Sequence, residues 1–412
     1  MIFTLPRGVV YHKVGDDIKW LIQATYSKLD DQSLIKEFEN NFASYIRRQY
    51  CVAFPFARTA IYLALKLKDF PQGSEIIMPP ITIKGILDVV LDLKLKPIFV
   101  DIDPDTLCFD IEKLNTAITK NTKAIIITYL FGMVPNIEKM ISDCRANNLF
   151  VIEDFSQCLN GKFKNRKTGS FGDVGVYSAS SIKTLDTYGG GLLVCDDKSL
   201  NERLKKEQVK LLPPARIQLI KKIIIDLVRN IATNRIVFHI VVFPLIKLLN
   251  YFKPDTLMKQ TGDRDKNMIS SLPSAWFNSY TSFQAMIGLK LLDKTEISDQ
   301  KRLKNVKEIQ NNTNTLSFPS GVKNAENVYW QLVSYFEKPN EIRKYLHSKK
   351  IDTATTSLEK ISSLPAYPYQ EKTPNADRLY TNALFMPCYP SLKDKDIKYL
   401  CNALNNIPKD SL

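Results

Sequence analysis

Short apolar runs that alternate with helical segments between residues 50 and 200 constrain the fold of this chain most. The runs lie at 50–54, 75–78, 97–101, 124–129 and 149–153, with two more at 174–177 and 191–195. Apolar side chains at helical spacing lie at 34–48, 59–68, 84–93, 111–119 and 136–147. Apolar strands separated by helices are typical of a parallel sheet covered by helices on both faces. We therefore predict an α/β fold built on such a sheet.

The length and the changes in pattern predict four regions. At 412 residues, the chain is long enough for a large core and a smaller lobe. The predicted regions are an N-terminal arm (1–30), a large α/β domain (31–209), an apolar and basic helical insertion (210–265) and a smaller α+β domain (266–412). The last region combines a strand-like run at 328–336 with helices at 340–348 and after Ser391.

The charge balance favours anionic partners. The chain has 57 basic and 43 acidic residues, a net charge of +14, which suits nucleotide or phosphate substrates, an anionic membrane or nucleic acid. Nucleic acid is not expected, because zinc-finger spacing, RNP-like motifs and basic aromatic repeats are missing. Three histidines and seven scattered cysteines without a C-x-x-C pair predict no metal site and a reducing cytoplasm. The N-terminus also lacks the pattern of a signal peptide.

Two residues at expected strand ends suggest imine chemistry. In open α/β sheets, ligands bind beyond the carboxyl ends of the strands. Asp154 ends an apolar run, where burial disfavours its charge unless a cation pairs with it. Lys183 lies among small hydroxyl residues, and a desolvated lysine can lose its proton and attack an aldehyde. Alone, each signal is weak, since such an aspartate is more often a helix cap and a lone lysine a solvated charge.

A longer pattern runs through both residues. The segment VIEDFSQCLNGKFKNRKTGSFGDVGVYSASSIKTLDTYGGGLLV combines E-D-x-x-Q, G-S-x-G-D, [FY]-S-x-x-x-x-K and a closing glycine pair. It resembles the core signature of the DegT/DnrJ/EryC1/StrS family of pyridoxal 5′-phosphate (PLP)-dependent sugar aminotransferases. TKAIIITYLFGMVPNIEKM and ADRLYTNALFMPCYPSLKDKDIKYLCNAL are similar to further family segments, in the same order. The resemblance covers nearly the whole chain.

The resemblance implies a fold and a cofactor site. The fold is the type I fold of PLP-dependent transferases, a mostly parallel seven-stranded sheet between helices with a smaller C-terminal α+β domain. Lys183 would be the Schiff-base lysine and general acid/base, Asp154 would pair with the pyridinium nitrogen, and Gln157 would lie near the phenolic oxygen. The phosphate would be bound by Ser178 and by the N–H groups at Arg58 and Thr59.

The resemblance also implies a reaction and partners. An amino donor, usually glutamate, leaves its nitrogen on the cofactor, and a keto-sugar, usually nucleotide-linked, takes it up. Such enzymes serve surface polysaccharide or amino-sugar biosynthesis and act as homodimers whose active sites draw residues from both subunits. A non-catalytic scaffold or regulator of the same fold is the alternative. A sugar dehydratase is disfavoured by Lys183, since histidine replaces this lysine in the relatives that dehydrate.

Several positions depart from the family pattern. Ala57 stands in the turn before the phosphate-binding helix, next to Arg58, which adds a charge. Ile83 takes the place of the aromatic residue that stacks on the pyridine ring, and it can cover the ring without a π-face. Ser279 stands where the segment that crosses the dimer has an arginine, and Asn278 would make the cross-subunit contact.

The insertion is the largest departure. Residues 217–228 form a helical apolar stripe beside Lys221, Lys222 and Arg229, and 236–246 are nearly all apolar. That run is too short to span a bilayer, which takes about 20 apolar residues, and Pro244 predicts a kink. Residues 216–252 would be buried against the core or the dimer partner, or would lie in a membrane interface. The second interpretation predicts an enzyme peripheral to the inner face of the membrane that aminates a lipid-linked sugar.

Overall fold

The computed structural model of the chain describes residues 3–252, 269–356, 358–364 and 372–408. Its centre is a seven-stranded sheet. The strand order is β1 (Tyr50–Phe54), β10 (Gly191–Cys195), β9 (Val174–Ser178), β6 (Phe150–Asp154), β5 (Thr122–Thr128), β2 (Glu75–Met78) and β4 (Lys96–Phe99). β10 is antiparallel to both of its neighbours, and the other pairs are parallel. The predicted mostly parallel sheet is confirmed.

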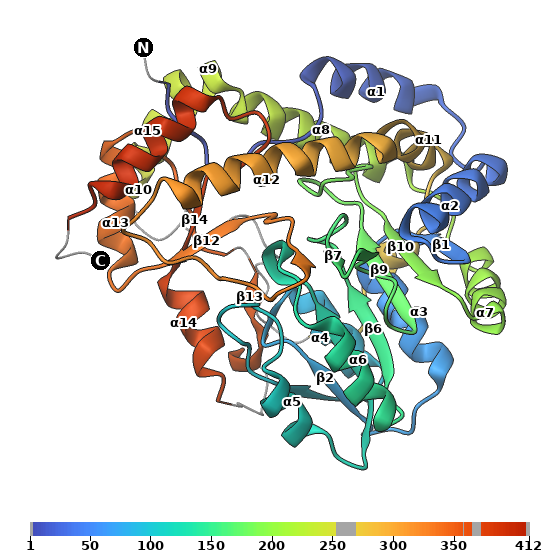
Figure 1. Cartoon of the computed structure of the whole chain (residues 1–412). Coiled ribbons are helices and arrows are strands. Elements are labelled where there is room, and N and C mark those ends of the chain that lie inside the picture. Colours follow the sequence, from blue (N-terminus) through green and yellow to red (C-terminus); the bar gives the residue numbers. More distant parts are fainter. Residues whose placement is uncertain (1–2, 253–268, 357, 365–371, 409–412) are drawn as a thin grey trace.

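Two apolar cores cover the two faces of this sheet, because successive strand residues point to opposite sides. On one face, Val151 and Leu192 pack with α2 (Gln32–Ile46), α5 (Ile111–Ala117) and α6 (Ile137–Ala146). On the other face, Ile152 and Leu193 pack with α3 (Ala57–Lys68), α4 (Lys84–Asp92) and α7 (Lys198–Val209). The layers of helix, sheet and helix are visible in Figure 1.

The C-terminal part forms a smaller lobe with its own core. This core contains α12 (Thr295–Asn311), α13 (Pro339–Ser348), α15 (Asp394–Asn405), β12 (Leu332–Tyr335) and β14 (Ala383–Met386). α14 (Pro374–Asn382) packs beside β14 in a neighbouring cluster. α11 (Ser282–Leu291) instead packs against α2 of the larger lobe. Gly288 makes this contact possible, because a Cβ there would lie 2.4 Å from the ring of Phe38.

The insertion is helical and bent. α8 (Arg216–Thr233) is followed by α9 (Arg235–Val237), a π-helix (Phe238–Val242) and α10 (Phe243–Phe252). The axis turns by 62° between α8 and residues 235–249, so a bend that the sequence did not predict falls at Asn234. Asn234 has non-helical ψ, and Pro244 lies in a continuous helical segment directly after the π-helical turn Phe238–Val242.

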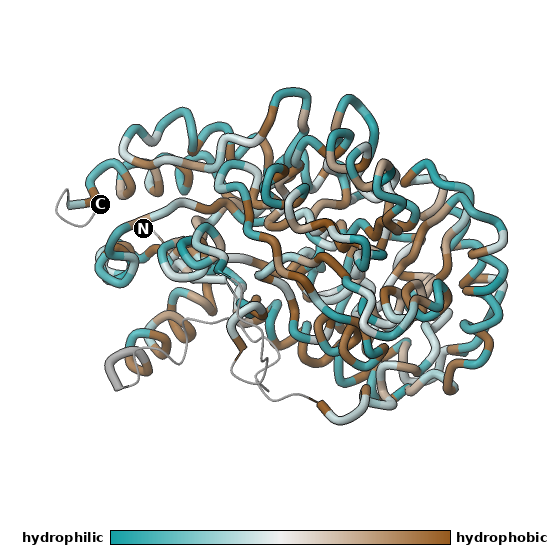
Figure 2. The backbone as a smooth tube through the Cα atoms, turned by 90° about the horizontal axis from the view of Figure 1, so that it is seen from below, coloured by the Kyte–Doolittle hydropathy of each residue, from teal (hydrophilic) through white to brown (hydrophobic). Residues whose placement is uncertain are grey.

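Only part of the insertion is buried. Leu219 and Ile223 of α8 pack under α1 (Val14–Tyr26), whereas the apolar side chains of its other face are exposed. Figure 2 shows the apolar colour continuing along the helix that precedes the undescribed segment. Within the described residues, no single helix is long and apolar enough to cross a membrane, although the bent pair passes that test by length and composition.

A buried polar network joins the N-terminal arm to α8. The His12 ring bonds Asp17 at 3.1 Å and the Asp186 carbonyl at 2.8 Å. Asn230 of α8 donates to Asp17 at 2.7 Å, and the Tyr188 hydroxyl donates to the same carboxylate. Burial lowers the pKa of His12, but the nearby carboxylates of Asp186 and Asp17 outweigh it and raise the pKa to about 9. A charged His12 therefore balances two buried acids.

Candidate active site

The carboxyl ends of the parallel strands bring the candidate residues together. Asp154 is the last residue of β6 and lies opposite Val176 of β9, two residues before Ser178. Ser178 pairs with Gly191, and Gly191 pairs with Phe54 at the end of β1. A Cβ on Gly191 would lie 2.3 Å from the backbone of Phe56, so this close approach requires glycine. Strand register alone therefore gathers these side chains at one edge of the sheet.

Asp154 is a buried carboxylate. Its Oδ1 accepts a hydrogen bond from the Ser156 N–H at 3.1 Å. Burial raises its pKa, and the hydrogen bonds from Ser156 and the charge of Lys183 lower it only in part. Thr128, its neighbour on β5, has a buried hydroxyl with no hydrogen-bond partner among the described residues. The carboxyl ends of β5 and β6 thus bring together the Thr128 hydroxyl and the Asp154 carboxylate, two buried groups that can make further hydrogen bonds.

Lys183 lies in a loop with a strained residue beside it. Burial lowers its pKa to about 8, against the attraction of Asp154. Its Nζ lies 4.2 Å from the ring centroid of Trp330, whose Nε1 donates to the Ile182 carbonyl at 3.1 Å. Ile182 is β-branched and has a φ of +66°, a conformation that costs about 1–3 kcal/mol and clusters at functional sites. Packing around the loop therefore holds Ile182 in a strained backbone conformation.

The residues expected around a phosphate group meet at the start of α3. No side chain caps this helix end, whose N-cap residue is Phe56. The N–H of Thr59 donates to the Phe56 carbonyl at 3.1 Å and its hydroxyl donates to the Trp276 carbonyl at 2.6 Å, so both groups are engaged. Arg58 stacks on Trp276 with its Cζ 4.1 Å from the ring centroid. The Ser178 hydroxyl bonds that of Ser180 at 2.9 Å.

The other expected site residues differ in their contacts. The Gln157 Oε1 accepts from the Phe131 N–H at 2.6 Å, and among the described residues none accepts from its Nε2. Ile83 caps α4 and is 40% exposed, so it is open to a ligand. The Nδ2 of Asn278 donates to the Pro213 carbonyl of its own chain at 2.9 Å, and Ser279 bonds Leu212.

Three residues near the site were missed from the sequence. Trp330 comes from the smaller lobe and lies over Lys183. The Ser181 hydroxyl donates to the carboxylate of Asp226 on α8 and lies within 2.7 Å of both its oxygens, so Asp226 holds the loop of Lys183. Lys222 of α8 lies 4.5 Å from the Phe56 ring centroid. The signal for Lys222 and Asp226 was their i, i+4 spacing, which puts both on one helix face.

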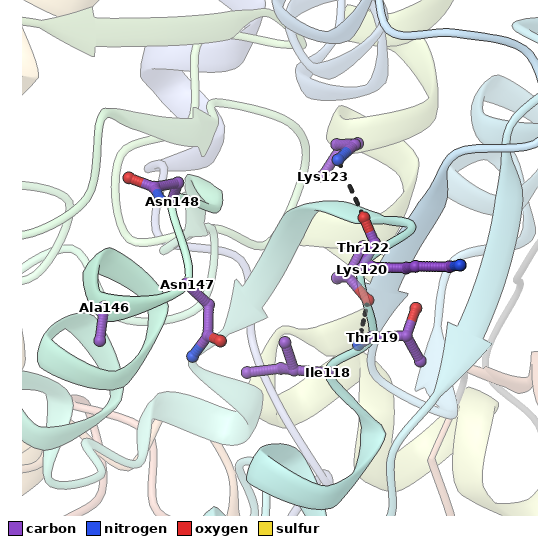
Figure 3. Close-up of a pocket in the computed structure, with 8 residues that line it drawn as sticks. All are labelled: Ile118, Thr119, Lys120, Thr122, Lys123, Ala146, Asn147 and Asn148. Atoms are coloured by element: carbon purple, nitrogen blue, oxygen red, sulfur yellow. Dashed lines mark hydrogen bonds between the residues drawn. The ribbon is translucent and has the colours of Figure 1, made fainter.

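A pocket lies at the opposite end of the strands from the candidate site. Figure 3 shows it between the start of β5 and the end of α6, where Lys123 donates to the Lys120 carbonyl. It is lined by Ile118, Thr119, Lys120, Thr122, Lys123, Ala146, Asn147 and Asn148. The lining holds no carboxylate and no buried amine, and ligands of open α/β sheets bind at the other end of the strands. The chemistry therefore belongs to the edge with Asp154 and Lys183.

Comparison with known proteins agrees with this geometry. The model of the DegT/DnrJ/EryC1/StrS aminotransferase family matches residues 16–212 and 256–405. The chain belongs to this family. GDP-perosamine synthase of Escherichia coli O157:H7 is 26% identical over 383 residues, which cover 91% of this chain and 90% of that protein. L-glutamine:2-deoxy-scyllo-inosose aminotransferase of Streptomyces kanamyceticus is 32% identical over 187 residues, 45% of this chain and 43% of that protein.

The fold of the DegT family member agrees with solved structures. The sugar aminotransferase CalS13 from Micromonospora echinospora superposes with a TM-score of 0.75 at 19% identity, over 97% of this chain and 99% of that chain. Aminotransferases of the DegT family depend on PLP, and this chain is a PLP-dependent aminotransferase. The type I fold expected from the sequence is confirmed.

The residues present fit PLP. Asp154 is a buried acid that a pyridinium nitrogen would pair with, and the Thr128 hydroxyl beside it lacks a partner among the described residues. Lys183 has the lowered pKa that imine formation with an aldehyde needs. At the start of α3, Arg58 and Lys222 offer positive charge for a phosphate. The donor set thus matches the ring nitrogen, the aldehyde and the phosphate of the cofactor.

Proposed function

We propose that the protein transfers an amino group from glutamate to a nucleotide-linked keto-sugar, as part of amino-sugar or surface polysaccharide biosynthesis. Asp154, which is buried, and Lys183, which is half-buried, carry the proposal, because they supply the two groups that amine transfer through PLP needs. A nucleotide-linked sugar as acceptor is supported by the end-to-end match with a GDP-perosamine synthase and by the net charge of +14.

The chain's own residues divide the work in this proposal. Bound PLP supplies an aldehyde that carries the amino group and a ring that accepts electrons. Lys183 holds the cofactor and moves a proton at its Nζ, which a pKa of about 8 leaves partly neutral near neutral pH. Asp154 keeps the ring nitrogen protonated, while Gln157 offers its Nε2 to the phenolic oxygen and Ile83 covers the ring. Ser178, Arg58 and the start of α3 bind the phosphate.

The donor half of the reaction tests this proposal. Purified protein with PLP and glutamate is expected to form one equivalent of 2-oxoglutarate and to lose the visible band of the lysine-bound cofactor. Adding nucleotide-linked keto-sugars should restore the band and yield an amino sugar. Glutamine is run as a second donor, since one relative is named for it. If neither donor gives a keto acid although PLP is bound, the proposal fails and the scaffold interpretation replaces it.

A lipid-linked sugar is the second candidate acceptor, and the exposed face of the insertion favours it. Eight large apolar side chains on this face are more than half exposed: Ile217, Ile225, Val228, Ile236, Ile240, Val241, Leu245 and Leu248. We call this set the apolar face. Basic residues flank it, and a basic apolar surface suits an anionic membrane interface. The alternative role of this face is contact with the second subunit of a homodimer. In that arrangement, Asn278 of each subunit would reach the site of the other.

Vesicle binding separates these two roles of the apolar face. The protein is expected to co-sediment with anionic vesicles and far less with zwitterionic ones. Ile240→Glu should weaken this binding about tenfold or more, because burying one isoleucine contributes about 1.5–3 kcal/mol. Ile297→Glu is the matched control, since Ile297 is 56% exposed on α12, away from the insertion. If Ile240→Glu splits a dimer and vesicles bind neither protein, the membrane proposal is wrong.

A further inference from the structure

Helix α8 lies outside the segments that match the family model, yet one of its faces reaches the candidate site. The match ends at residue 212 and resumes at 256, whereas α8 covers Arg216–Thr233. On its inner face, Asp226 holds Ser181 and Asn230 holds Asp17. Lys222 stands one turn before Asp226 on the same face. The insertion therefore adds side chains to the site as well as surface to the molecule.

Lys222 is a half-buried cation next to another cation. Its Nζ lies 4.5 Å from the ring centroid of Phe56, and the Arg58 Cζ lies 4.8 Å from the same centroid. A Cβ on Gly189 would be 2.5 Å from the Nζ, so this ammonium lies directly against the glycine turn. Burial and the charge of Arg58 together lower the pKa of Lys222 to about 8, against the opposing effect of the Asp226 and Asp186 carboxylates.

No carboxylate among the described residues forms an ion pair with Lys222, although Asp226 and Asp186 favour its charge from a distance. The nearest acid on its own helix, Asp226, is engaged by Ser181 and by Arg229, which donates to it at 3.0 Å. The described residues accept no hydrogen bond from Lys222 and form no ion pair with it; its Nζ lies against the Phe56 ring and the Gly189 turn. Two cations around one ring repel each other, and an anion between them would relieve this repulsion.

The surroundings of Lys222 select the kind of anion. Phe56 is the N-cap residue of α3, a helix end without a side-chain cap, and such an end favours negative charge. The residues that line a pocket beside it include Phe56, Gln218, Lys222 and Asn278. Two cations and a helix N-terminus suit a dianion such as a phosphate monoester. Ser178 and Gly191 place this point at the same sheet edge as Asp154.

We propose that Lys222 binds the phosphate group of PLP together with Arg58, so that the inserted helix supplies part of the cofactor site from within the same chain. The proposal rests on the cofactor and not on the identity of the amino acceptor. It also gives the insertion a role that its exposed apolar face does not explain.

Binding of two cofactor forms without an aldehyde tests the role of Lys222. Pyridoxamine 5′-phosphate and pyridoxamine cannot form an imine with Lys183, and they differ only in the phosphate. Calorimetry on the apoprotein is expected to show that Lys222→Met weakens pyridoxamine 5′-phosphate about 10- to 100-fold, as for the loss of a charge-assisted hydrogen bond. The binding of pyridoxamine should change by less than about threefold. No substrate takes part, so the outcome is independent of the proposed acceptor.

The neighbouring lysine provides the matched control. Lys221 is exposed on the outer side of α8, and Lys221→Met should bind both compounds like the natural chain. Lys222→Arg should recover most of the affinity for the phosphorylated form. Equal losses for both compounds in Lys222→Met would mean a damaged fold rather than a lost phosphate contact, and unchanged affinity for pyridoxamine 5′-phosphate would mean no contact at all. Either result overturns the proposal.

Discussion

Replacing Lys183 by alanine is expected to lower the rate of amino transfer at least about 10⁴-fold, the upper end of what general acid–base catalysis contributes. Lys183 is the lysine on whose charge Asp154 acts, so its amine is the candidate for both imine formation and proton transfer, and alanine supplies neither. The visible band of the lysine-bound cofactor should disappear, and 2-oxoglutarate formed from glutamate in a single turnover measures the rate. PLP itself should still bind through its phosphate and ring nitrogen.

A second lysine, Lys167, is the control that shows whether the reaction depends on the position of Lys183 or only on a lowered lysine pKa. Burial also lowers the pKa of Lys167 to about 8, but its Nζ lies 3.4 Å from the ring centroid of Tyr45, and the charges that act on it are those of Glu296, Asp299, Lys162 and Arg47 rather than Asp154. Lys167→Ala is therefore expected to keep the band and the rate. If Lys183→Ala keeps more than about one hundredth of the natural rate, well above the expected level, Lys183 is not the residue that carries the reaction.

Replacing Asp154 by asparagine is expected to slow the half-reaction with glutamate about 10- to 1000-fold. A facing opposite charge shifts a pKa by about 1–3 units, and asparagine would no longer keep the ring nitrogen protonated to that extent. PLP should still attach to Lys183, so the visible band remains while its loss on adding glutamate slows. Stopped-flow absorbance after mixing with glutamate measures this rate.

Asp154→Asn slows the reaction, but it is expected to stabilise the folded apoprotein above the pKa of Asp154. Burial raises the pKa of Asp154 above its value in the unfolded chain, about 3.9. Between the pKa of Asp154 in the unfolded chain and its higher pKa in the folded chain, the unfolded state loses the proton first. The free energy of unfolding therefore falls as the pH rises through this range, and it stays lower at higher pH. Asp154→Asn should abolish this loss in urea unfolding.

Asp173 is the control for Asp154. Its Oδ2 accepts from the Val151 N–H at 2.6 Å, which fixes the turn before β9. Asp173→Ala should therefore cost about 1–3 kcal/mol of unfolding free energy and leave the half-reaction nearly unchanged. A slow half-reaction in both variants would indicate that the loss follows from a loosened sheet and not from the ring nitrogen.

The sequence predicted the strands and the cofactor pair for a common reason. Buried parallel strands are short apolar runs, and β2, β9 and β10 lie within one residue of their expected ends. Because ligands bind where such strands end, the position of Asp154 followed from the run before it. The antiparallel direction of β10 was not predicted, since an apolar run carries no direction.

The rest of the site depends on contacts that a local pattern cannot contain. The stripe at 217–228 predicted a helix, but not which face would be buried, because isoleucines lie on both sides of α8. Trp330 reaches Lys183 from another lobe, 147 residues along the chain. Thr59 was expected to offer its N–H, yet that group completes the first turn of its own helix. These outcomes are decided by packing between elements.

The network around His12 also bears on how the chain assembles during synthesis. A ribosome releases Asp17 long before Asn230, its partner 213 residues later, and Arg7 before Asp352, 345 residues later. The N-terminal arm must therefore wait, with polar groups unpaired, until most of the polypeptide has emerged. Since such distant contacts form slowly, docking of the arm is a late event that closes the finished molecule. A tag or fusion at the N-terminus would burden this last step and leave the central sheet free to form.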